Sequence, residues 1–278
     1  MESIALIGAG GKIGCRITDN LRHMQYDVRY VENGKNGIEN LEKRGLSITP
    51  IMDAVKNADA VILAVPDRLM NEIASEIVPL LKQGCLVITL DPAAGYGGLL
   101  PVREGVSHFI VHPCHPPVIN DETDPEAKMD FYGGVKAKQN IVCALLNGSE
   151  KDYQFGERIA RGIFAPVMKA HRVTVEQMAM LEPAMAETVS LTLMYAIKEA
   201  MEEVVKAGVP EEAARDFLLG HININIGIFF GYCDAHFSDG AMKMVERAKQ
   251  TLLRPDWKKA LEPKNIMKEV KSIVGTTQ

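Results

Sequence analysis

Short apolar runs rich in β-branched residues alternate with segments of helical periodicity along residues 1–172. The predicted strands read SIALIG, DVRYV, AVILAV, CLVITL, HFIV and IVCALL, and APVMKAHRV is a candidate for one more. The predicted helices between them cover residues 12–23, 36–44, 68–82 and 150–163. This alternation is typical of an α/β fold with a doubly wound, mostly parallel sheet. We therefore predict an N-terminal α/β domain over residues 1–172.

The pattern changes after this region, where strand signals largely stop and long helical patterns follow. Thr174, with a glutamine three residues later, forms a capping box that starts a helix, which we expect to run to about Ala207. Gly208 and Pro210 then end this helix and begin the next one. The sequence therefore predicts an all-α domain over residues 173–278.

The first helix of this second domain is apolar on almost every side. Between Met178 and Ile197 its only charged residues are Glu182 and Glu187. A helix that is hydrophobic all round is normally buried, so we expect it to pack against a second copy of the chain in a homodimer. Two carboxylates in such a helix are costly unless they are paired, hydrogen-bonded or used in chemistry. They lie about 140° apart on an ideal helix, although Pro183 provides a place for a bend.

Composition narrows the classes of partner. The chain has 278 residues, 47% of them hydrophobic, and a net charge of -5 with both signs interspersed. This pattern is not typical of proteins that bind nucleic acid or a membrane surface, and no apolar stretch reaches the roughly 20 residues of a membrane span. Five scattered cysteines without a CxxC motif fit a reducing compartment. We expect a soluble cytoplasmic protein with a small-molecule substrate.

A glycine-rich turn follows the first predicted strand, in the sequence ALIGAGGKIGCRI. Glycines at a turn between a strand and a helix let a dinucleotide pyrophosphate approach the helix N-terminus, which indicates a Rossmann domain. The alternative is a structural glycine turn without a cofactor. The predicted cofactor loop comprises Gly8, Gly10, Gly11, Lys12, Ile13 and Gly14.

Two further segments complete the predicted cofactor site. Glu32 ends the second strand, where an acidic side chain binds the adenosine ribose and repels a 2′-phosphate. This favours NAD over NADP, although Lys35 nearby leaves that preference open. Ala64, Val65 and Pro66 are expected at the carboxyl end of their strand, where doubly wound sheets bind ligands.

The motif VHPCHPP follows another predicted strand and has three interpretations: a metal site, a substrate or acid–base site, and a stiff turn. In polyproline II geometry, His112 and His115 point the same way and Cys114 points elsewhere. This favours a histidine pair over a Cys–His site. A zinc ion needs at least one more protein ligand, which an acid of the helical domain could supply. We prefer histidines that bind substrate or transfer protons, and we assign no metal ligand.

Polar residues also occur in the segment GHININIGIFFG, which we expect to be helical although HININI alternates as a strand does. In a helix, His221 and Asn225 share one face at i, i+4 spacing. This arrangement indicates a cleft that contains water. The alternative is a hydrogen-bonded core histidine with an asparagine that bonds a neighbouring helix.

The strings GAGGKIG, DAVILAVPD, HPCHPP, EQMAMLEPAMAETV and GVPEEAARDFLLGHI resemble NAD-binding oxidoreductases with a phosphogluconate-dehydrogenase-type C-terminal domain, a group that includes D-apionate oxidoisomerase. The resemblance covers nearly the whole chain. It implies NAD-dependent oxidation of a branched sugar acid coupled to an α-ketol rearrangement. It also implies a helical domain that dimerises. The candidate catalytic residues are then His112, His115, Glu182, Glu187, His221 and Asn225.

Two alternatives stay open. A 3-hydroxyacid or phosphogluconate-type dehydrogenase commonly carries a catalytic lysine on the interdomain helix, but this chain has no lysine between Arg172 and Lys198. A redox sensor that binds NAD without turnover belongs to another class. It is distinguished by whether the polar residues of the cleft are dispensable.

Overall fold

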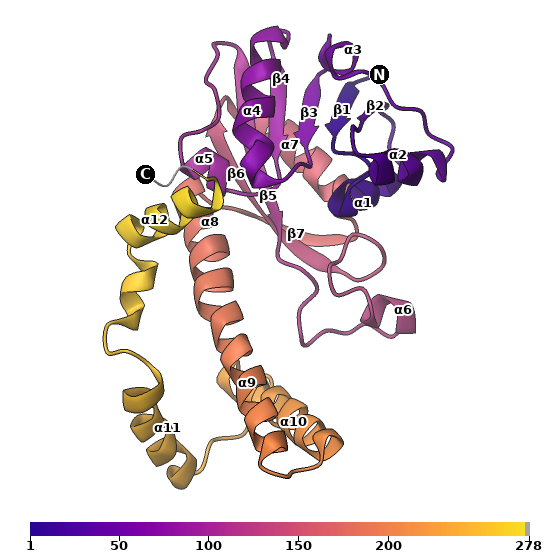
Figure 1. Ribbon diagram of the computed structural model, residues 1–278. Coiled ribbons are helices and arrows are strands. Elements are labelled where there is room, and N and C mark those ends of the chain that lie inside the picture. Colours follow the sequence, from indigo (N-terminus) through magenta and orange to yellow (C-terminus); the bar gives the residue numbers. More distant parts are fainter. Residues whose placement is uncertain (276–278) are drawn as a thin grey trace. The chain divides into compact units, whose positions relative to one another are not determined.

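Seven strands form a single sheet in the computed structural model, which describes residues 1–275 (Figure 1). The order is β2-β1-β3-β4-β5-β6-β7, and every neighbouring pair is parallel except β5 with β6. The predicted mostly parallel α/β fold is confirmed. The strands are β1 (Ser3–Ile7), β2 (Asp27–Val31), β3 (Ala60–Leu63), β4 (Cys85–Thr89), β5 (Val106–Pro113), β6 (Gln139–Asn147) and β7 (Val167–Arg172).

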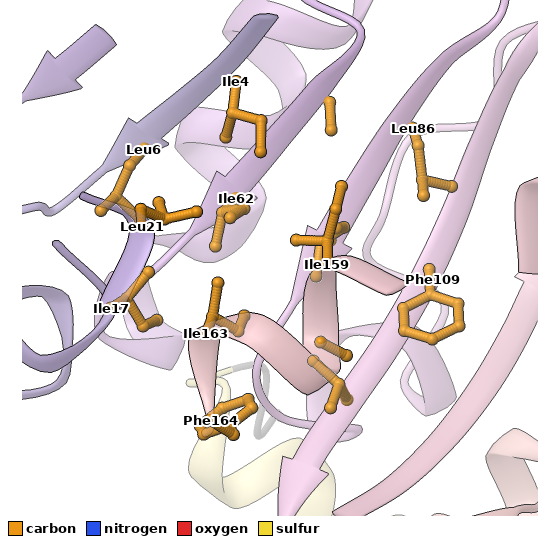
Figure 2. Packing of buried hydrophobic residues seen from close by; sticks show 14 of the residues in the cluster. Ile4, Leu6, Ile17, Leu21, Ile62, Leu86, Phe109, Ile159, Ile163 and Phe164 are labelled. Atoms are coloured by element: carbon orange, nitrogen blue, oxygen red, sulfur yellow. The ribbon is translucent and has the colours of Figure 1, made fainter. Parts of the chain in front are cut away.

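Helices cover both faces of this sheet because the strands carry apolar side chains on each face. Ile4 and Leu6 of β1 pack with the cluster that includes α1 (Lys12–Leu21) and α7 (Glu150–Ile163), and Figure 2 shows this face. The other face packs against α3 (Ile51–Val55) and α4 (Asp67–Ile77). The remaining short helices of the region are α2 (Lys35–Glu42), η1 (Val78–Leu80), α5 (Ala93–Tyr96) and α6 (Pro125–Lys128).

The chain forms two compact units. The first contains Met1–Pro183 and the chain from Ile266 onward, and the second contains Ala184–Asn265. The division at residue 172 stays a prediction, because units defined by contacts need not coincide with domains defined by architecture. Helices after β7 are α8 (Val175–Ala179), η2 (Met180–Leu191), α9 (Thr192–Lys206), α10 (Glu211–Phe229), α11 (Asp239–Leu252), η3 (Trp257–Leu261) and α12 (Pro263–Ile273).

The long helix predicted from Thr174 is helical through Lys206, but it is not regular. Its middle part, η2, is a π-helix that contains Pro183. Proline has no N–H to donate to the i−4 carbonyl, so it interrupts the α-helical ladder and favours a local change of pitch. Wide turns of this kind are frequent at functional sites.

The first turns of this helix are buried, but beyond Ala184 its expected burial is not found within one chain. No residue of α9 is buried, and Leu191, Leu193 and Tyr195 are well exposed. The helical expectation for HININI is confirmed, since it lies inside α10. Within residues 1–275, none of the helices combines the length and the apolar run needed to cross a bilayer.

Candidate active site

A cavity of about 490 Å³ lies in the first unit. Its wall is made by the residues that follow β1, β2 and β3, together with one side of α4. This is the place where a doubly wound sheet binds a dinucleotide. Of the predicted cofactor residues, its lining includes Gly8, Gly11, Glu32, Ala64, Val65 and Pro66. Their role in cofactor binding stays a prediction.

The glycine loop is packed too closely for side chains at several positions. Gly8 has a φ of +81°, and a Cβ there would lie 2.3 Å from the carbonyl oxygen of Ala64. A Cβ on Gly14 would lie 1.9 Å from the carbonyl oxygen of Gly8. Gly10 is equally confined, since its Cβ would lie 2.1 Å from the oxygen of Gly37. The glycines therefore bring the first turn of α1 against β1 and the loop after β3.

Glu32 is held at the end of β2 by backbone N–H groups. Its carboxylate accepts hydrogen bonds from the amides of Gly10 and Gly34, both at 2.9 Å. The acid expected to bind ribose is thus tied to the glycine loop. Of the other predicted loop residues, Ile13 packs against the core, and the Lys12 ammonium lies 3.7 Å from the centre of the Tyr132 ring.

Three parallel strands end side by side at one edge of the sheet, and the residues after the first of them, β3, line this cavity. Leu63 of β3, Thr89 of β4 and Ile110 of β5 form one row of the sheet. Asp91 and His112 each come two residues after their member of that row. The register therefore brings an aspartate and a histidine to the same edge of the sheet.

Glu182 joins them from the helical segment. Val175 and Met178 of α8 pack on Ile110 and Val142 of the sheet, which fixes the start of the helix. Glu182 follows Met178 by one turn. Ligand atoms of Asp91, His112 and Glu182 all lie within 4.8 Å of one another, and the three side chains are partly buried.

A hydrogen bond of His112 fixes which of its two ring nitrogens carries the proton. Its Nδ1 lies 2.8 Å from the carbonyl oxygen of Leu90, and because a carbonyl only accepts, Nδ1 carries the proton. In the neutral ring, Nε2 is then an unprotonated nitrogen with a lone pair. Nε2 lies 3.7 Å from Oε1 of Glu182, and Nδ1 lies 4.0 Å from Oδ2 of Asp91.

His115 lies next to His112, with ring centroids 6.0 Å apart. The polyproline II prediction is wrong at His115 itself, since its φ of +61° is in the left-handed region. Its Nδ1 lies 2.9 Å from the carbonyl oxygen of Tyr132, which leaves Nε2 as the unprotonated nitrogen of the neutral ring. Cys114 is exposed. The Lys12 ammonium of α1, which lies against the Tyr132 ring, lowers the pKa of the Tyr132 hydroxyl and places positive charge beside this loop.

Sequence reasoning missed two aspartates at this edge. Asp91 follows the strand CLVITL directly, and Asp67 follows the strand AVILAV after one proline. Burial raises the pKa of Asp67 to about 6, and the nearby Asp91 carboxylate adds to the shift. The strand-end argument that selected His112 would have found both residues.

The other predicted catalytic residues lie in the second unit. Glu187, His221 and Asn225 are exposed there. The Nδ1 of His221 lies 2.7 Å from the carbonyl oxygen of Phe217, and the two rings are stacked with centroids 4.0 Å apart. The catalytic role of these three residues stays a prediction.

Comparison with known proteins identifies the family. D-apionate oxidoisomerase from Rhizobium rhizogenes is 49% identical over 274 residues, which cover 98% of this chain and all of the relative. The enzyme of the same name from Cupriavidus necator is 46% identical over 98% of this chain and 99% of its own length. The chain belongs to the D-apionate oxidoisomerase family. The predicted resemblance is thereby confirmed.

Domain families and a solved structure agree with this membership. Residues 1–119 match the acetohydroxy acid isomeroreductase NADPH-binding domain, and residues 120–274 match the C-terminal domain of decarboxylating phosphogluconate dehydrogenase. A crystal structure of a semialdehyde dehydrogenase NAD-binding protein from Cupriavidus necator, in complex with calcium and NAD, has a TM-score of 0.96. It is 46% identical, over 98% of this chain and 99% of that one. The prediction of NAD as the cofactor agrees with that complex.

The position of Glu32 makes its effect on cofactor choice testable. The substitution Glu32→Gln keeps a side-chain acceptor for the loop amides but removes the charge that repels a 2′-phosphate. We expect the ratio of the NADPH and NADH dissociation constants to fall by about tenfold, or about 1.4 kcal/mol. Fluorescence titration with both nucleotides measures it. Glu39→Gln, an exposed residue of α2, is the control, and an unchanged ratio in Glu32→Gln would contradict the assignment.

Proposed function

We propose that the protein oxidises a branched sugar acid of the D-apionate type with NAD⁺ and couples this oxidation to an α-ketol rearrangement. The observation that carries the proposal is the group of Asp91, His112 and Glu182, which lies at the sheet edge where the residues after β3 line the predicted nucleotide cavity. Two carboxylates and an imidazole at that place supply proton acceptors and negative charge close to the expected nicotinamide position. Two 46–49% identical relatives named D-apionate oxidoisomerase support the substrate class.

The reaction has two steps that balance without any further reactant. In the first, the C2 hydroxyl loses its proton to a base and the C2 hydride passes to NAD⁺, which leaves a 2-oxo acid and NADH. In the second, the tertiary C3 hydroxyl loses its proton, and a hydroxymethyl carbon moves with its bonding electrons from C3 to C2. C3 becomes a ketone and the C2 oxygen takes up a proton. The product is a 3-oxo branched acid.

His115 is the base that the geometry favours. The hydrogen bond at Nδ1 fixes its tautomer, so Nε2 of the neutral ring carries the lone pair that accepts a proton. The Lys12 ammonium of α1, which lies against the Tyr132 ring, supplies positive charge for the substrate carboxylate. Asp91, His112 and Glu182 then act on the oxygen atoms at C2 and C3.

We infer a homodimer formed through the second unit. An apolar pocket of about 590 Å³ lies between α9 and α10. Large apolar side chains are exposed on these helices, and a surface of this kind is typical of protein–protein contacts. They include Leu193, Met194, Tyr195, Phe217, Leu219, Ile224 and Phe229. We also infer a cytoplasmic location, which five free cysteines support.

Replacement of His115 tests the proton acceptor. His115→Ala is expected to lower kcat/KM by about 10² to 10⁴, because a positioned base is lost, while the dissociation constant for NADH stays unchanged. The exposed His23→Ala is the matched control and is expected to keep full turnover. Full NADH formation by His115→Ala would show that another group is the base.

Carbon migration tests the reaction itself. With D-apionate labelled with ¹³C in its hydroxymethyl carbons, product NMR is expected to show one labelled carbon bonded to C2 after NADH has formed. Simple 3-hydroxyacid or phosphogluconate-type oxidation leaves the label on C3. That result would contradict the rearrangement. The absence of NADH with every C4 to C6 sugar acid would favour an NAD-binding sensor instead.

The solution mass tests the dimer. Light scattering is expected to give twice the 30.5 kDa of one chain. Leu193→Glu places a charge on the exposed apolar surface of α9 and is expected to shift the mass toward one chain. Leu80→Glu, at a similarly exposed leucine of the first unit, is the control. A mass of one chain for the unmodified protein at micromolar concentration would contradict the dimer.

A further inference from the structure

We propose that Asp91, His112 and Glu182 bind a divalent transition-metal ion of the Mn²⁺ class, which serves the rearrangement step. The existence of the site rests on its geometry alone. Its role in the rearrangement rests on the proposed function.

The first argument is the orientation of the imidazole. Histidines that bind a metal almost always donate their other ring N–H to a carbonyl or carboxylate, which fixes the tautomer. His112 does this, because Nδ1 donates to the carbonyl of Leu90 at 2.8 Å. The lone pair of Nε2 is therefore presented on the side where Oε1 of Glu182 lies.

The second argument is the spacing of the three groups. The distance of 3.7 Å between Nε2 and Oε1 is too long for a hydrogen bond but suits two ligands of one ion. Two ligand atoms about 2.1 Å from the same ion lie at most about 4.2 Å apart. The ligand atoms of the triad lie within 4.8 Å of one another, so small side-chain rotations close the site.

The third argument is how firmly separate parts of the chain hold the ligands. Asp91 is positioned through β4, His112 through β5, and Glu182 through the packing of α8 on the sheet. The Oδ1 of Asp91 also accepts a hydrogen bond from the amide of Ala93 at 2.7 Å, which orients the carboxylate. Ligands that are held before the ion arrives lose little conformational freedom on binding.

The donor set determines the class of ion. Ca²⁺ prefers six to eight oxygen ligands and Mg²⁺ prefers oxygen in octahedral geometry. One imidazole and two carboxylates suit Mn²⁺, Fe²⁺, Co²⁺ or Zn²⁺ better. Three protein ligands also leave positions for substrate oxygens. A bound ion would act there as a Lewis acid toward the 2-oxo group and the C3 hydroxyl oxygen, which would polarise the new ketone and ease loss of the hydroxyl proton.

Direct binding of Mn²⁺ tests the site without reference to turnover. The full-length protein with NADH is treated with chelator, desalted, and titrated with Mn²⁺ by calorimetry and by electron paramagnetic resonance. We expect one ion per chain. Asp91→Asn and Glu182→Gln are each expected to raise the dissociation constant by about 100-fold, and His112→Gln by a similar factor. Glu104→Gln, an exposed carboxylate of the first unit, is the control and should bind as the unmodified protein does.

The outcomes separate the metal site from the proposed function. Each variant is first shown to bind NADH and to keep its circular dichroism spectrum, so that loss of Mn²⁺ is not loss of folding. Failure of the unmodified protein to bind Mn²⁺, or equal binding by all three ligand variants, overturns the site. Binding as expected without NADH from any sugar acid supports the site and contradicts only the proposed function.

The role of the ion has its own test. The metal-free protein is expected to lose at least 100-fold in the rate of rearranged product, and Mn²⁺ is expected to restore it more fully than Ca²⁺. An unchanged rate of rearranged product in the metal-free protein overturns the role while leaving the proposed function intact.

Discussion

The parallel pairing of β3, β4 and β5 is the constraint on which the candidate site depends. Hydrogen bonds between these strands place Leu63, Thr89 and Ile110 in one row, so the residues that follow emerge at the same edge. The cofactor cavity, Asp91 and His112 all lie beyond that row. A shift of one strand by one residue would turn His112 to the other face of the sheet. The apolar cores on both faces of the sheet therefore stabilise the fold and also fix the positions of Asp91 and His112.

The helical segment after β7 supplies Glu182, the third residue of the candidate site. Packing of Val175 and Met178 on the sheet fixes its first turns. The π-helical geometry of η2 then begins at Met180, immediately before Glu182. A change of pitch at this place alters the direction in which each later side chain points. Glu182 consequently belongs to the site in the first unit, whereas Glu187 lies exposed in the second.

The second unit presents a different kind of surface. Its helices α9 and α10 expose large apolar side chains and enclose an apolar pocket, although the chain as a whole has ample core elsewhere. In the proposed homodimer, burial of this surface against the second chain would release water from apolar groups, which is the main favourable term in most protein association. This explains why a helix with almost no polar side can be exposed in one chain. The apolar composition of a helix predicts that it is buried. It does not show whether the burial occurs inside the chain or against a second chain.

The sequence by itself determined the sheet, the glycine turn and the family, because each depends on local patterns. Short continuous apolar runs specify buried strands, and glycines before a helix allow the tight turn and positive φ that other residues rarely adopt. The motif VHPCHPP likewise identified His112 and His115. Tertiary structure alone decided that His112 is joined by Asp91 and Glu182, since these residues are separated along the chain by 21 and 70 positions. Their meeting depends on strand register, on one helix packing against the sheet, and on a change of helical pitch, none of which a local pattern specifies.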